Sequence, residues 1–195
     1  MPADQVIVIR HAEKPTEKPK RHGVREDGSN DKESLTVRGW RHAGALAAVF
    51  AAEGAHPDGA RIGRPAHIFA AGIGKKAVKR DGKPVTVGSH SARPVQTVSD
   101  MAGRLGLTPI TDHTRGEEAD LVADATSRDG TVLICWQHEA IPEIGRAIAG
   151  DDAGVPDTWP DDRYDLVWIF DRKGRGWTFR ELEHPRLAPT ASSVV

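Results

Sequence analysis

The sequence predicts an α/β protein with a three-layer α/β/α arrangement, in which helices cover both faces of a largely parallel central sheet. Short apolar runs, QVIVIR at 5–10 and TVLICW at 131–136, are typical of strands that are buried on both faces. Segments with apolar residues at helical spacing lie between such runs. Strands that alternate with helices along a chain indicate a parallel sheet.

Each element has its own local signal. Thr36 is a good N-cap, and apolar or small residues follow it at helical spacing. Alternating residues on either side of DRKGRG predict a C-terminal hairpin over about 164–181. The expected strands are 5–10, 66–71, 131–136, 164–170 and 176–181, with a short extended piece at 108–111. One expected helix starts at 36. The other expected helices cover about 93–105, 117–127 and 140–149.

Two segments are expected to be long loops. Residues 14–34 contain two prolines, two glycines and many charges, and residues 72–90 are rich in Gly and Lys. No linker or domain-sized repeat is visible, so the 195 residues are expected to form one domain over 1–195. The tail from Leu187 is expected to be frayed.

Composition excludes some classes of partner and indicates a cellular location. The formal net charge is −1, so no overall field draws the chain to nucleic acid or to a membrane. There is no signal-peptide pattern and no membrane-length apolar run, and a cytoplasmic location is therefore expected. Cys135, the single cysteine, is interpreted as a buried small hydrophobe. The oligomeric state is not indicated.

Metal and nucleotide motifs are absent from the sequence. No His-x-x-x-His pair and no paired cysteines occur among the nine histidines and one cysteine, so neither a metal nor a cofactor is expected. GIGKK at 72–76 lacks the spacing of a phosphate-binding loop.

Two histidines follow two apolar strands in the same way. VIVIRH ends on Arg10 and His11, and TVLICWQH ends on His138. Ligands of open α/β sheets bind at the carboxyl ends of strands. Arg93 opens a helix after Ser89 and Ser91, where free N–H groups and a guanidinium favour a phosphate. These residues predict a phosphate site at one edge of the sheet.

Four motifs together resemble the histidine phosphatase superfamily, which includes the cofactor-dependent phosphoglycerate mutases. They are RHAE at 10–13, LTVRGWRHA at 35–43, SHSARPVQT at 89–97 and WQHE at 136–139. They occur in the family's order and span most of the chain. One departure is Ala12, which stands where the family has a glycine, and a slightly altered loop is expected there.

The resemblance implies a phosphatase that acts on a phosphomonoester or phosphohistidine, without a metal. His11 would be the nucleophile that becomes phosphohistidine. Arg10, Arg93 and His138 would bind the phosphoryl oxygens, with His138 as a cation. A phosphomutase and a non-catalytic phospho-ligand-binding protein are the alternatives.

The proton donor to the leaving group is not fixed by the sequence. Glu139 is the first candidate, because its neighbour His138 would hold it near the phosphate. Glu118 is the second and is also a candidate substrate-binding residue. Glu117 and Glu13 stay open.

Two basic segments bear on the substrate. Residues 14–25 and 75–83 each contain five Lys or Arg residues and follow strands that are expected to end at the site. They favour a substrate with several anionic groups, either a polyphosphorylated metabolite or an acidic phosphoprotein segment.

Overall fold

A five-stranded sheet forms the centre of the protein, in a computed structural model that describes residues 2–52 and 62–183. The strand order is β4-β7-β1-β8-β9. β4, β7 and β1 run parallel, whereas β8 is antiparallel to β1 and to β9. The predicted α/β class with a largely parallel central sheet is confirmed. The strands are β1 (Gln5–Arg10), β4 (His67–Ala70), β7 (Thr131–Trp136), β8 (Leu166–Lys173) and β9 (Gly176–Glu183).

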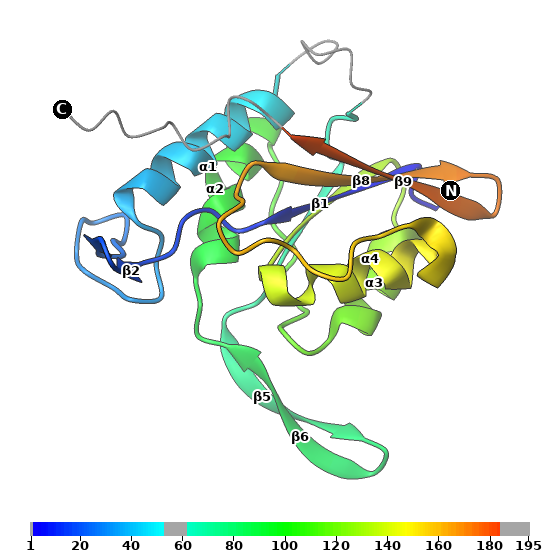
Figure 1. Cartoon of the computed structure of the whole chain (residues 1–195), viewed down its shortest axis with the longest axis horizontal. Helices are drawn as coiled ribbons and strands as arrows, with labels where there is room; N and C mark the ends of the chain where they lie inside the picture. Colours follow the sequence, from blue (N-terminus) through cyan, green and yellow to red (C-terminus); the bar gives the residue numbers. More distant parts are fainter. Residues whose placement is uncertain (1, 53–61, 184–195) are drawn as a thin grey trace.

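Four α-helices pack against this sheet as two pairs (Figure 1). One hydrophobic cluster contains Ile7 and Ile9 of β1 together with residues of α1 and α2. A second contains Val6 and Val8 of the same strand together with residues of α3 and α4. Because side chains alternate along a strand, β1 contributes to both clusters. The three-layer arrangement stays an interpretation, which these two clusters support. The helices are α1 (Val37–Phe50), α2 (Arg93–Leu105), α3 (Glu118–Ser127) and α4 (Ile141–Ala149).

Thr36 begins helix α1 as the sequence predicts. Its side-chain oxygen accepts a hydrogen bond from the backbone N–H of Gly39. Its own N–H donates to the carbonyl of Glu13 at 3.0 Å. The first turn of α1 is therefore tied to the segment that leaves β1, and a Cβ on Gly39 would lie 2.7 Å from that same carbonyl oxygen. Glycine at position 39 is what allows the helix to approach so closely.

The prediction of a loop over 72–90 is wrong. Most of this segment forms an antiparallel hairpin of β5 (Gly74–Arg80) and β6 (Lys83–Ser89) around a turn at Asp81 and Gly82. Its lysines and glycines concealed the strands, because residues that face water on both sides leave no apolar alternation to detect.

The remaining connections are short or irregular. The 14–34 segment is mostly loop, with two-residue strands β2 (Thr16–Glu17) and β3 (Lys20–Arg21). Two 3₁₀ turns, η1 (His138–Ala140) and η2 (Asp151–Ala153), flank α4. The expectation for the tail from residue 187 lies outside the described residues. No helix within residues 2–52 and 62–183 has the length and hydropathy to span a membrane.

Gly39→Ala is expected to destabilise the protein, because the new methyl group would collide with the backbone of Glu13. Overpacking of this kind costs about 1–3 kcal/mol. Gly44→Ala in the same helix is the matched control, since a Cβ there meets nothing within 4 Å. That change is expected to stabilise by about 0.5–1 kcal/mol through helix propensity. Urea denaturation measures both, and equal effects would contradict the role of Gly39.

Candidate active site

The parallel pairing of β1 with β7 brings the two histidine segments to one edge of the sheet. Arg10 is the register partner of Trp136, and the N–H of His11 donates to the Trp136 carbonyl at 3.0 Å. β7 then leads through Gln137 into the 3₁₀ turn that begins at His138. His11 and His138 therefore leave neighbouring strands at the same level, as the sequence predicts.

Arg93 joins this edge through a chain of hydrogen bonds. The N–H of Ala12 donates to Thr97 Oγ1 at 2.9 Å, and that hydroxyl donates to the Arg93 carbonyl at 2.7 Å. The N-terminal turn of α2 is thus held against the residue that follows His11. The Arg93 side chain is further fixed by a 2.9 Å hydrogen bond from Nη1 to the carbonyl of Lys32.

The guanidinium of Arg10 contacts both the backbone of a loop and an aromatic ring. Its Nη1 atom points to the backbone of one loop, and the shortest of its contacts is 2.7 Å to the carbonyl of Asp161. Its central carbon lies 3.9 Å from the ring centre of Tyr164, which gives a cation–π contact. Nε and Nη2 are buried and have no hydrogen-bond partner among the described residues. One side of Arg10 is therefore fixed by the loop, and two donors remain for a ligand.

His11 has a defined tautomer. Its Nδ1 atom lies 2.7 Å from the carbonyl oxygen of Ala12. A carbonyl oxygen can only accept, so Nδ1 carries the hydrogen and Nε2 carries the lone pair. Burial lowers the pKa of His11 to about 3. The nearby charges of Arg10 and Arg93 act in the same direction. His11 is consequently neutral at physiological pH, with Nε2 able to act as a nucleophile.

His138 lies between two carboxylates. Its Nε2 is 2.6 Å from Asp161 Oδ1, and its Nδ1 is 3.2 Å from Glu139 Oε2, without the geometry of a hydrogen bond in the second case. Burial and the charge of Arg10 nevertheless lower the pKa of His138. These surroundings therefore disfavour the cationic His138 expected from the sequence. Binding of a phosphate dianion would favour it.

Buried donors without partners gather at this edge. They are Arg10 Nε and Nη2 and Arg93 Nε, and the Ser91 hydroxyl is also buried without a partner within the described ranges. A buried polar group that makes no hydrogen bond costs about 1–3 kcal/mol. Burial also lowers the pKa of both arginines, because burying two positive charges is unfavourable. A negatively charged ligand would offset that cost. An oxyanion would satisfy these donors.

Three of the four candidate glutamates, Glu118, Glu117 and Glu13, form hydrogen bonds or ion pairs with other protein groups. Glu118 is buried, and its Oε1 accepts from the indole N–H of Trp136 at 3.0 Å and from the N–H of Gly116 at 2.9 Å. The Glu117 carboxylate pairs with Lys76 at 2.9 Å. These contacts make both residues anchors of the fold. The role of Glu118 as a substrate-binding residue or proton donor is thus not favoured.

Glu13 is engaged on the other side of the His11 segment. Its carboxylate accepts from His42 Nδ1 at 3.0 Å and pairs with Arg38 at 3.1 Å. Burial acts to raise the pKa of Glu13, but His42 and Arg38 outweigh it and the pKa is lowered. Glu139 differs from the other three, because its side chain is half exposed and its charge acts on both Arg10 and Arg93.

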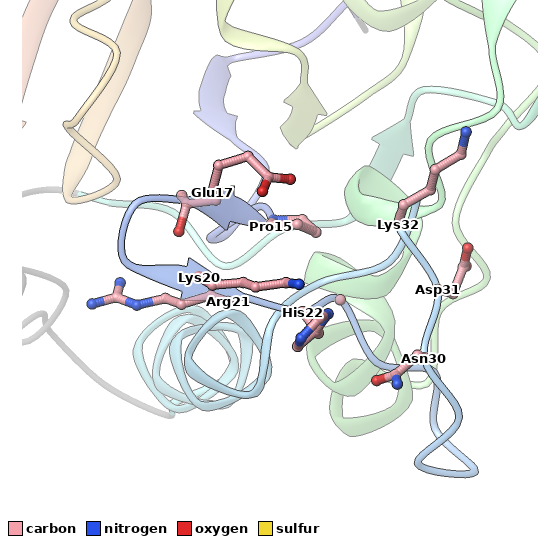
Figure 2. Close-up of a pocket in the computed structure, with 10 residues that line it drawn as sticks. Pro15, Glu17, Lys20, Arg21, His22, Asn30, Asp31 and Lys32 are labelled. Carbon is pink, nitrogen blue, oxygen red and sulfur yellow. The ribbon is translucent and has the colours of Figure 1, made fainter.

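A separate pocket of about 190 Å³ lies in the 14–34 loop. Figure 2 shows its walls, which come from the β2–β3 region and from residues 30–32. It contains none of the four predicted phosphate-binding residues, and its side chains carry both signs of charge. It adjoins the site through Lys32, whose carbonyl accepts a hydrogen bond from Arg93, and through Asp31, whose charge acts on Arg93. It is therefore not the phosphate site itself. The lining residues that Figure 2 labels are Pro15, Glu17, Lys20, Arg21, His22, Asn30, Asp31 and Lys32.

Solved structures share this architecture at low sequence identity. The SixA phosphohistidine phosphatase described from Agrobacterium tumefaciens is 18% identical, with a TM-score of 0.50 over 92% of this chain and 97% of its own. A protein histidine phosphatase SixA bound to tungstate is 13% identical, with a TM-score of 0.52 over 92% and 96%. A mycobacterial glucosyl-3-phosphoglycerate phosphatase is 13% identical, with a TM-score of 0.51 over 91% and 97%.

The fold is that of a histidine phosphatase. The resemblance seen in the sequence motifs is thus confirmed at the level of the fold. No protein-family model and no curated protein sequence matches the chain.

The sequence did not reveal two residues that complete this edge of the histidine phosphatase fold. Asp161 contacts Arg10 through its carbonyl and His138 through its carboxylate. Tyr164 stacks on Arg10. Both follow η2 in a segment without secondary structure, where no periodicity marks them. The charged run DTWPDDRYD was the one available signal.

The burial of neutral His11 predicts a specific pH dependence of stability. The ordinary histidine pKa is about 6.5, and the folded value is about 3. Between these values the unfolded chain binds a proton that the folded chain does not, so stability rises with pH in this window. From pH 7.5 to 4.5, His11 therefore removes about 2–3 kcal/mol of unfolding free energy.

His11→Asn is expected to reduce the acid sensitivity of the fold by that amount. Urea denaturation at pH 7.5 and 4.5 gives the difference for each protein. His90→Asn, which replaces an exposed histidine, controls for the loss of a histidine as such. An identical pH difference in wild type and His11→Asn would show that His11 is not held neutral.

Proposed function

We propose that this protein is a phosphatase that hydrolyses a phosphomonoester or phosphohistidine through a phosphoryl group carried on His11 Nε2. The observation that carries the proposal is the coincidence of a neutral, oriented His11 with buried arginine donors that lack partners. A protein that only bound phosphate would have no need of the fixed tautomer. The similar SixA structure holds tungstate, an oxyanion that resembles phosphate.

The proposed reaction has two steps. Nε2 of His11 attacks phosphorus, a P–N bond forms, and the bond from phosphorus to the leaving oxygen or nitrogen breaks. Water then attacks the phosphohistidine, the P–N bond breaks, and phosphate and neutral His11 are released. Phosphoryl transfer needs in-line positioning and charge stabilisation more than covalent assistance. The hydrogen bond from Nδ1 to Ala12 fixes the ring for both steps.

Arg10 and Arg93 supply the charge stabilisation in this proposal. Arg10 offers Nε and Nη2 as a fork that matches two phosphoryl oxygens, and Arg93 adds Nε from the helix N-terminus. His138 lies beside them and becomes a better donor when the phosphate raises its pKa. These groups deliver positive charge where kinases use Mg²⁺, so we propose that no metal takes part.

Glu139 is the proposed proton donor to the leaving group. It is the candidate glutamate whose carboxylate is not committed to a structural contact, since its nearest partner is His138 in a 3.2 Å approach. After it protonates the leaving group, Glu139 is a carboxylate that can accept the proton of the attacking water in the second step, and half exposure of its side chain leaves room for that water. Asp161 is a second carboxylate on the same histidine, but its hydrogen bond to His138 gives it an orienting task.

The first prediction concerns the nucleophile. His11→Ala is expected to abolish turnover of p-nitrophenyl phosphate, because it removes the nitrogen that is proposed to attack phosphorus. Arg93→Ala is expected to lower kcat by about 10²–10³, the usual cost of one pre-organised donor. Mass spectrometry after an alkaline denaturing quench locates the phosphoryl group, and assays contain excess chelator.

Two results would contradict this mechanism. One is a phosphoryl group found on His138 with His11 unmodified. The other is activity that is lost with chelator and returns with Zn²⁺ or Mg²⁺, which would indicate a metal-dependent phosphatase.

The second prediction concerns proton donation. Glu139→Gln is expected to slow hydrolysis of alkyl phosphates by about 10²-fold or more, because their alkoxide leaving groups need a proton. The same variant is expected to hydrolyse p-nitrophenyl phosphate at nearly the wild-type rate, since that leaving group departs as an anion. Glu118→Gln and Asp161→Asn are the matched comparisons. Equal losses on both substrates in Glu139→Gln would indicate a structural role instead.

A further inference from the structure

The β5–β6 hairpin is an exposed, basic arm beside the phosphate site. Figure 1 shows it as a two-stranded ribbon that projects from the body of the protein. Residues 74–89 carry five Lys or Arg residues and one Asp, a net charge of +4 in a chain whose formal net charge is −1. The outer residues are exposed on both strands. The arm is therefore positively charged, whereas the rest of the chain carries a net negative charge.

The base of the arm is fixed to the body next to the site. The N–H of Gly88 donates to the Arg115 carbonyl at 2.7 Å, and Lys76 pairs with Glu117 at 2.9 Å. Val87 is buried against Gly116. β6 ends at Ser89, whose hydroxyl accepts from the N–H of Ser91, and Arg93 follows directly. A molecule held along the arm is consequently led toward the arginines.

The outer cations of the arm have no ion-pair partner within the described ranges. These cations are Lys75, Lys79, Arg80 and Lys83. Arg80 and Lys83 are directly opposite each other in the ladder, and like charges at such positions destabilise a hairpin. An anion between them would remove that cost.

The same face of the arm offers apolar contact. Val78 and Val85 are cross-strand partners one step inside the Lys79–Pro84 pair. Val85 is 39% exposed, and Ile73 at the base is 59% exposed. The two strands pair with each other and with no other strand of the described chain. Their outer edges can therefore accept an added strand through backbone hydrogen bonds.

The length of the arm distinguishes between kinds of substrate. Six residues separate the Gly74–Ser89 pair from the Arg80–Lys83 pair, which corresponds to about 20 Å at 3.3 Å per residue. A small phosphorylated metabolite bound by Arg10 and Arg93 does not reach the outer cations. A polypeptide does, with its phosphorylated side chain in the site and an acidic segment along the arm.

We propose that the β5–β6 hairpin is a docking arm for an acidic segment of a phosphoprotein substrate. This inference rests on the proposed phosphatase activity and specifies its substrate class. Glutamates or aspartates six or more residues from the phosphorylated side chain would pair with Arg80 and Lys83. The Val78–Val85 pair would contact an apolar residue between them.

The test uses two synthetic peptides that each carry one phosphohistidine. In the first, six residues separate the phosphohistidine from four glutamates, and in the second four glutamines replace them. Arg80→Gln/Lys83→Gln neutralises the tip of the arm, and Arg80→Glu/Lys83→Glu reverses it. Lys173→Gln/Arg175→Gln removes two exposed cations from the β8–β9 turn and is the matched control.

The neutralised arm is expected to lower kcat/KM for the glutamate peptide about fivefold, the scale of two exposed ion pairs. The reversed arm is expected to lower it further, and added salt should abolish the preference for glutamate. Turnover of p-nitrophenyl phosphate and of the glutamine peptide should be unchanged in all variants, as should every activity of the β8–β9 control.

Several outcomes would overturn the inference. Equal kcat/KM for the two peptides, or arm variants that match the β8–β9 control, would mean that the lysines only keep the ribbon soluble. Stronger competition by a thymidine 20-mer than by the glutamate peptide would indicate a nucleic-acid site.

Fluorescence anisotropy with His11→Ala measures docking without turnover. Arm-dependent binding in a protein that hydrolyses no substrate would overturn the proposed function and leave docking standing.

Discussion

The in-register parallel pairing of β1 with β7 is the constraint on which the rest of the site depends. It sets Arg10 beside Trp136 and lets the N–H of His11 donate to the Trp136 carbonyl, so the two strands end at one level. A shift of one residue would turn His11 from one face of the sheet to the other. Register is secured by burial, because all six residues of β1 are buried and its four apolar side chains pack alternately in the two hydrophobic clusters.

The site is assembled from backbone contacts more than from side-chain pairs. Carbonyl groups fix Arg10 through its Nη1, Arg93 through Lys32, and His11 through Ala12. Carbonyl oxygens hold a donor without neutralising its charge. Most of the positive charge of the arginines is thus retained in a buried place, where electrostatic interactions are stronger than in water. The Glu33 carboxylate approaches Arg93 Nη2 only at 3.9 Å. A carboxylate within hydrogen-bond distance would orient the same donor but offset more of the charge that a phosphoryl group needs.

Sequence reasoning succeeded where one local rule decides the structure. The buried strand 5–10, the N-cap Thr36 and the helix that starts at Arg93 all follow from burial pattern, capping or proline position. It failed for the β5–β6 hairpin, whose strands are mostly exposed and rich in lysine, and for Asp161 and Tyr164, which tertiary contacts alone bring to Arg10. It ranked Glu139 above Glu118 but could not reveal the contact that engages Glu118, since the indole of Trp136 is 18 residues away in the chain.

The outer edge of β4 has a consequence for solubility. An uncovered edge strand can pair with another chain and start aggregation. Here the segment at Ile110 lies along β4, accepting from the N–H of Ala70 at 3.0 Å and donating to the Ile68 carbonyl at 2.8 Å. On the other side of the sheet, the end of β9 carries the charged residues Arg180, Glu181 and Glu183. With both margins of the central sheet blunted in this way, the β5–β6 ribbon is left with two unpaired strand edges, and its lysines repel a second copy of the same ribbon.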